Sequence, residues 1–143
     1  IKHSHDGALY KVKDIFFHKR PQLAITQINT VLTAAGQPTL ANMDELTDFA
    51  DYKVPQILRK KGLLVYDYVL SSKVDSGIPL ENGSVEEIEI RANDIWAIES
   101  MVSLLKPRLP QVNAVKLHSY FWQMGQIKSP DDKPYHRTIT TNY

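Results

Sequence analysis

The chain has 143 residues, of which 43% are hydrophobic, so it is long enough to form one domain with a sizeable core. Its 17 Lys and Arg residues against 16 Asp and Glu leave a net charge of +1, which excludes bulk electrostatic attraction to nucleic acid or anionic lipid. Because it has no cysteine and no apolar run near the roughly 20 residues that span a bilayer, we expect a globular, cytoplasmic protein.

The first strong helical pattern lies between Phe17 and Ala35. Its apolar residues recur at intervals of three and four, and Gly36 follows as a residue that can end a helix in the left-handed conformation. Pro21 suits the first turn, where no backbone donor is missed, and this favours a later start over one at Asp14. We therefore expect a helix that faces the core.

Two further short helices are predicted next. Asn42 and Glu45 form a capping-box-like pair before a short apolar face, so a second helix should end near residue 50. A third should carry Pro55 near its first turn and stop at Gly62, after a basic run that suits a helix C-terminus. The segment DFADYKVPQ, residues 48–56, would then join two helices.

The second half of the chain is less regular at first. Residues 65–69 fit either a strand or a helix, and the polar stretch 71–84 is typical of a loop. Residues 88–90, Ile-Glu-Ile, alternate as in a short strand. After them, Asn93 is a candidate cap for a helix that ends at Pro107.

The last predicted helix runs from about Gln111 to Met124, and the tail after it is polar and irregular. These patterns together predict a mostly α-helical fold, with residues 1–143 forming a single helical domain. A minor pair of short strands remains compatible with them.

Most familiar site motifs are missing from the sequence. His3 and His5 are spaced as HxH, but no third ligand is near, so no metal site is expected. There is no GxGxxG, GxxxxGK[ST] or GxSxG motif, which excludes the phosphate-loop and nucleophile-elbow classes. Trp96, Phe121 and Trp122 lie on predicted helices and are assigned to core packing.

Two stretches remain as candidates for chemistry, HKRPQ at 18–22 and FADYKVPQ at 49–56. Physical chemistry alone gives them a structural interpretation. Lys19 and Arg20 would form a solvated helix start, and the Asp51 carboxylate would cap the following helix.

FADYKVPQ resembles the FADYRVPQ-type segment of the queuosine salvage proteins, the queuosine 5′-phosphate N-glycosylases. Three other stretches match that family in order: a KR-x-Q segment at 19–22, EIEIRANDIWAIE at 87–99, and HRTITTNY at 136–143. The chain differs from the family pattern at Pro21, at Asp94 and in the closing ITTNY. The resemblance covers about residue 15 to the end, and it implies the C-terminal catalytic part of a longer protein whose N-terminal half is absent.

The resemblance implies a helical fold similar to the helix-hairpin-helix DNA glycosylases, acting on a free nucleotide and releasing queuine for reinsertion into tRNA. The family's catalytic Asp and Lys correspond to Asp51 and Lys19. Phe49 and Tyr52 flank the carboxylate as candidates to pack on ribose or base, with core packing as the alternative for Phe49. Arg20 is a candidate phosphate contact.

No cofactor is expected for such an enzyme. Its expected partners are the nucleotide substrate and the missing N-terminal half, without direct nucleic acid or membrane contact. The substrate base is a 7-deazaguanine, which lacks the N7 that ordinary purine leaving groups can protonate, so another group must assist its departure.

Two other interpretations remain open, a nucleic-acid-binding helical domain of the glycosylase type and a non-catalytic scaffold. The environment of Asp51 distinguishes them. A position in a cleft near Lys19 favours the enzyme, whereas bonds only to backbone amides at the start of the next helix favour the scaffold.

Overall fold

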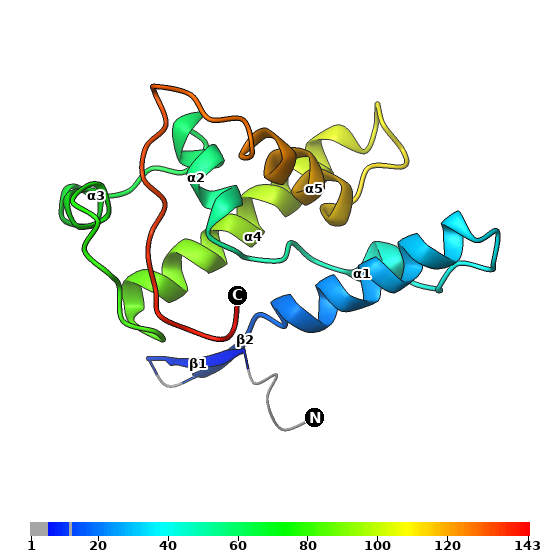
Figure 1. Cartoon of the computed structure of the whole chain (residues 1–143), viewed down its shortest axis with the longest axis horizontal. Helices are drawn as coiled ribbons and strands as arrows, with labels where there is room; N and C mark the ends of the chain where they lie inside the picture. Colours follow the sequence, from blue (N-terminus) through cyan, green and yellow to red (C-terminus); the bar gives the residue numbers. More distant parts are fainter. Residues whose placement is uncertain (1–5, 12) are drawn as a thin grey trace.

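The computed structural model describes residues 6–11 and 13–143, and the fold is mostly helical, as the sequence predicts (Figure 1). His3 and His5, considered above as metal ligands, lie outside the described residues. The elements in chain order are β1 Gly7–Tyr10, β2 Lys13–Phe16, α1 Lys19–Ala34, the 3-10 helix η1 Met43–Glu45, α2 Lys53–Lys60, α3 Tyr68–Asp75, α4 Val85–Leu105 and α5 Ala114–Met124.

Strands β1 and β2 form a small antiparallel sheet. Gly7 pairs with Phe16 at one end and Tyr10 with Lys13 at the other. The minor strand pair compatible with the sequence is therefore present, but at the N-terminal side of the chain. The strand expected at 88–90 is wrong, because these residues lie inside α4.

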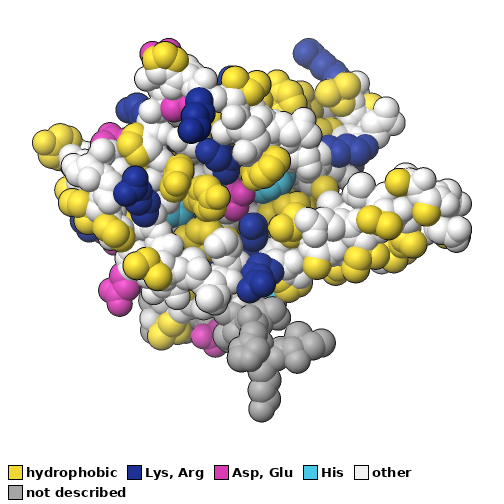
Figure 2. Space-filling view, in the orientation of Figure 1, with side chains coloured by type: hydrophobic (Ala, Val, Ile, Leu, Met, Phe, Trp, Pro, Cys, Tyr) yellow, Lys and Arg dark blue, Asp and Glu magenta, His cyan; other side chains and the backbone are white. Residues whose placement is uncertain are grey.

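Helix α1 begins two residues after and ends one residue before the predicted limits, with Pro21 in its first turn and Gly36 at φ 65° just after its end. Its predicted orientation toward a core is wrong. No residue of α1, which is described throughout, is buried, and Val31 is 67% exposed. The helix projects from the rest of the domain (Figure 1), and apolar side chains lie along it on the surface (Figure 2).

The helix predicted to end near residue 50 does not form. Asn42 is in the left-handed conformation, φ 58°, and its side chain makes no capping hydrogen bond with the described residues. Only the single turn η1 follows, and the backbone is extended at Leu46. Helix α2 then forms as predicted and is followed by Gly62 at φ 72°. Residues 48–56 thus join an extended segment to one helix.

Side-chain caps determine where α3 and α4 begin. Asp67 accepts a hydrogen bond from the Leu70 amide, so α3 occupies the first part of the predicted loop at 71–84. Ser84 accepts one from the Glu87 amide and starts α4 well before the predicted cap. Asn93 lies inside α4 and donates to a carbonyl of its own helix, while the predicted stop before Pro107 is confirmed.

Helices α2, α4 and α5 enclose the main core. Asn113 caps α5, which begins at Ala114, three residues later than the start predicted from the sequence. Phe121 is buried there as predicted, but Trp96 is 73% exposed and Trp122 44% exposed, so their assignment to the core is wrong. The buried members of this core are Val54, Ile57, Leu58, Leu64, Ile98, Ala114 and Phe121.

The C-terminal tail returns across the domain and ends close to the hairpin and the start of α1 (Figure 1). Thr138 forms an isolated bridge with Leu80, and the Arg20 side chain donates to the Thr141 carbonyl. Within the described residues, no helix combines the length and apolar character required to cross a membrane.

Candidate functional site

A cavity of about 480 Å³ opens between α1, the segment before α2, and α5. In this region of the surface, acidic, basic and histidine side chains lie close together beside the N-terminal end of α1 (Figure 2). Its walls include Lys19, Phe49, Asp51, Tyr52, His118 and Trp122. A cavity of this size, with apolar walls and a few charged groups, is typical of sites for small molecules.

Four of the five residues singled out from the sequence line this cavity, namely Lys19, Phe49, Asp51 and Tyr52. Phe49 is also almost fully buried, which agrees with the core packing given as its alternative role. Arg20 is not part of the wall. Its side chain turns to the C-terminal tail instead.

Asp51 is only 3% exposed, and the two oxygens of its carboxylate have different surroundings. Oδ1 accepts hydrogen bonds from the amides of Lys53, at 2.8 Å, and Val54, at 3.0 Å, in the first turn of α2. Oδ2 receives no hydrogen bond from the described residues. Asp51 therefore caps α2, as the structural interpretation predicts, and also lies in a cavity with Lys19, as the enzyme interpretation predicts. The capping bonds fix the orientation of the carboxylate and leave one oxygen available to a ligand.

The residue before Asp51 has an unusual backbone. Ala50 has φ 41°, in the left-handed region that residues with a side chain rarely adopt. Its N–H donates to Asp48 Oδ2 at 2.7 Å, and its carbonyl accepts from Arg91 Nε at 2.9 Å. Two charged side chains therefore hold this conformation from both sides, and the direction of Asp51 depends on them.

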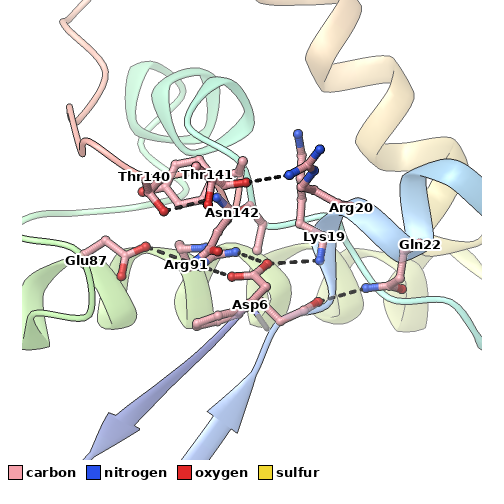
Figure 3. A network of polar contacts seen from close by, with 12 residues as sticks. Asp6, Lys19, Arg20, Gln22, Glu87, Arg91, Thr140, Thr141 and Asn142 are labelled. Carbon is pink, nitrogen blue, oxygen red and sulfur yellow. Dashed lines mark hydrogen bonds and ion pairs between the residues drawn. The ribbon is translucent and has the colours of Figure 1, made fainter. Parts of the chain in front are cut away.

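Arg91 of α4 is the centre of a buried ionic network (Figure 3). Its guanidinium donates to both oxygens of Asp6, at 2.7 and 2.6 Å, and to Glu87 at 3.3 Å. The rings of Phe17 and Tyr143 stack against the guanidinium, with centroids at 4.0 and 4.4 Å. Such a group is expensive to bury unless it is fully paired, and here every side of it has a partner.

The same network reaches the other predicted catalytic residue. Asp6 Oδ2 accepts a hydrogen bond from the backbone amide of Lys19, at 3.1 Å, at the start of α1 (Figure 3). Arg91 is thus connected to Lys19 through Asp6 and to Asp51 through the carbonyl of Ala50. This explains how residues 32 positions apart come to the same cavity, since both are tied to one buried guanidinium.

A second acidic group behind the cavity was not identified from the sequence. His118 of α5 lies with its Nδ1 2.8 Å from Oδ1 of Asp48, and its ring packs against Phe49 with centroids 4.5 Å apart. Asp48 is completely buried, and His118 lines the cavity. Asp48 is the first residue of the segment DFADYKVPQ, but its histidine partner lies 70 residues away in the sequence. No local sequence pattern therefore indicates the pair.

Asp94 of α4 is also completely buried near these groups. Burial raises the pKa of the Asp94 carboxyl well above its usual range, and the neighbouring Asp48 and Asp51 carboxylates raise it further, while Arg91 opposes them. The protonated form of Asp94 is therefore more stable than that of an ordinary carboxyl group. In the described part of the chain, no group of three or more His, Cys, Asp or Glu side chains is arranged to hold a metal ion.

These features describe a mostly helical chain in which one buried acid, Asp51, lines a cavity suited to a small ligand. A family model described as "Queuosine salvage protein" matches residues 1–143, that is, the whole chain. The chain therefore belongs to the queuosine salvage protein family. The resemblance seen in the four sequence segments is confirmed.

Several curated relatives carry the name "Queuosine 5'-phosphate N-glycosylase/hydrolase". One from Sphaerobacter thermophilus is 34% identical over 138 residues, covering 96% of this chain and 43% of the relative. One from Mus musculus is 34% identical over 147 residues, covering 96% and 44%, and one from Dictyostelium discoideum is 30% identical over 138 residues, covering 96% and 43%. The chain thus spans less than half the length of the curated relatives it matches.

Proposed function

We propose that the protein hydrolyses the N-glycosidic bond of queuosine 5′-phosphate and releases queuine, which can then return to tRNA. Membership of the family and the names of the curated relatives support this activity. The observation that carries it is Asp51, a buried and oriented carboxylate with one free oxygen in a cavity that also contains Lys19. A scaffold would require the cap on α2 but not the cavity.

Asp51 is our candidate for the group that acts on the sugar. Cleavage of the bond between ribose and base develops positive charge on the ribose, and a nearby carboxylate stabilises that charge. The same carboxylate can take a proton from the attacking water. The α2 amides that bind Oδ1 keep the group oriented, so little reorganisation is needed during the reaction.

Lys19 is our candidate for a positive group that orients Asp51 or contacts the sugar phosphate. Its main chain is anchored by Asp6, while its side chain lines the cavity. Phe49 and Tyr52 offer apolar surface for the ribose or base. Arg20 stands next to Lys19 outside the cavity wall, with its side chain on the C-terminal tail, and it stays our candidate for a contact with the phosphate.

The remaining recognition of base and phosphate is assigned to other parts of the protein. We infer that residues 1–143 are one helical domain, the C-terminal catalytic part of a longer chain, because the curated relatives are more than twice as long as the matched region. A similarity to helix-hairpin-helix DNA glycosylases, a cytoplasmic location, and action on a free nucleotide without direct nucleic acid contact belong to the same proposal.

Release of free base from queuosine 5′-phosphate, followed by chromatography, tests the proposal on the natural protein at its full length. The parent should release queuine, and Asp51→Asn, which keeps the shape but removes the charge, should lower the rate by about 10³-fold or more. Asp131→Asn, at an exposed carboxylate, is the matched control and should leave the rate unchanged. Equal release by the parent and Asp51→Asn would remove Asp51 from the mechanism. No release by the folded parent would refute the proposed activity.

A further inference from the structure

The pair formed by His118 and Asp48 has the geometry of a proton-transfer group. Asp48 uses Oδ2 to accept from the Ala50 amide, and its Oδ1 faces His118 Nδ1 at 2.8 Å. A carboxylate can only accept, so Nδ1 carries the hydrogen and Nε2 is left as the working nitrogen. Nε2 makes no hydrogen bond within the described part of the chain, and His118 is one of the residues that line the cavity.

The surroundings keep this ring in one position. His118 is 5% exposed, and Phe49 packs against one side of it. Asp48 is fixed at both oxygens, so it can hold the ring and compensate a positive charge when Nε2 gains a proton. A histidine with a purely structural role needs no unbonded ring nitrogen beside a cavity that also contains a carboxylate oxygen without a hydrogen bond.

The proposed reaction leaves a chemical task that Asp51 does not perform. When the glycosidic bond breaks, its electron pair goes to the base, and a 7-deazaguanine has no N7 to accept a proton in compensation. A proton must therefore reach another nitrogen or oxygen of the base. General acids positioned for such a transfer typically accelerate reactions about 10² to 10⁴-fold.

We propose that His118 is the general acid for the leaving base and that Asp48 is its positioning residue; this inference rests on the proposed function. His118 Nε2 gives its proton to the base as the bond from C1′ to the base nitrogen breaks, and the bonding pair goes to the base. Water attacks C1′, and its proton goes to Asp51. Solvent exchange then returns a proton to His118 and removes one from Asp51, so the net reaction consumes one water molecule.

The test compares two leaving groups on the natural protein at its full length. Queuosine 5′-phosphate needs a protonated base, whereas the 5′-phosphate of 4-nitrophenyl β-ribofuranoside releases 4-nitrophenolate without protonation. His118→Gln should lower kcat for the nucleotide about 10² to 10⁴-fold and kcat for the nitrophenyl substrate less than about 10-fold. Asp51→Asn should lower both. Tyr120→Phe, on the exposed side of α5, should change neither.

The outcomes separate this inference from the proposed function. If His118→Gln keeps kcat for the nucleotide within about threefold of the parent, or lowers kcat for both substrates by the same factor, His118 is not the general acid. Should glutamine disturb the fold, His118→Ala provides the second test, because added imidazole should restore nucleotide hydrolysis at least about 10-fold if the ring supplies a proton. Absence of that rescue in a folded His118→Ala protein refutes the inference. Inactivity of the parent on both substrates refutes the proposed function and this inference with it.

Discussion

The most direct physical test of the fold concerns His136 in the C-terminal tail. The side chain is 1% exposed, and burial, together with the charge of Arg91, lowers the pKa of His136 from 6.5 to about 4. The unfolded chain binds a proton near the ordinary value, but the folded protein does not until about pH 4. The folded state therefore loses stability as the pH falls from about 6.5 toward 4, and retains it above that range.

The size of the effect follows from the two pKa values. At 1.36 kcal/mol per pH unit, the whole shift corresponds to about 3 kcal/mol, and about 2 kcal/mol of this should be lost between pH 7 and pH 4.5. His136→Gln removes the titration. Urea unfolding followed by far-UV circular dichroism at both pH values should show a free energy of unfolding that falls about 2 kcal/mol more in the parent than in the variant.

The difference between the two proteins is the informative quantity. Asp75 and Asp132, whose pKa values are lowered by hydrogen bonds from Arg59 and Lys60, also cost stability at low pH. Both proteins contain them, so their contribution cancels. If the free energy of unfolding falls equally in the parent and in His136→Gln, His136 is not a buried neutral group. The packing described for the C-terminal tail would then be wrong.

Three further changes test the core and the ionic network, each by urea unfolding at pH 7. Arg91→Met leaves the buried carboxylates of Asp6 and Glu87 without their ion-pair partner and should lower the free energy of unfolding by about 3 to 5 kcal/mol. The exposed control Arg108→Met should change it by less than about 0.5 kcal/mol. A loss below about 1 kcal/mol for Arg91→Met would contradict the ionic network. Asp94→Asn should raise the free energy of unfolding at pH 7. Because burial raises the pKa of Asp94, this carboxyl stabilises the folded state only at low pH, and that contribution is lost as the pH rises above the ordinary pKa of an aspartate; asparagine has no charge to bury. A less stable variant would refute this. Ile98→Ala, in the buried core, should lower the free energy of unfolding by about 2 to 5 kcal/mol, and Val31→Ala, on the exposed surface of α1, by less than about 0.5 kcal/mol. Similar losses for the two variants would mean that α1 packs against the core.

The sequence predicted the fold where local signals are strong. Helices α1 and α2 end at glycines in the left-handed conformation, and α4 ends before Pro107, as expected. It failed at Asn42, where the capping residue itself takes a left-handed conformation, and at 88–90, where three alternating residues lie inside a helix that Ser84 caps. Both errors come from reading a short pattern without the longer element around it.

The site was predictable only in part, for a similar reason. The family pattern indicates Lys19 and Asp51, and the structure brings both to one cavity. The contacts that hold them join residues far apart in the chain, with 85 positions between Asp6 and Arg91 and 70 between Asp48 and His118. Such pairs depend on tertiary packing, which periodicity and spacing do not encode.

Asp48 connects the two halves of the proposed mechanism. One oxygen holds His118, while the other holds the amide of Ala50, whose left-handed backbone determines the direction of Asp51. That backbone costs roughly 1 to 2 kcal/mol. The hydrogen bond that the Ala50 amide donates to Asp48 and the one that its carbonyl accepts from Arg91, at about 1.5 to 3 kcal/mol each, are sufficient to offset this cost. Asp48→Asn should therefore disturb Asp51 as well as His118 and slow hydrolysis of both the nucleotide and the nitrophenyl substrate, unlike His118→Gln. If Asp48→Asn slowed only the nucleotide reaction, its contact with Ala50 would not be needed to position Asp51.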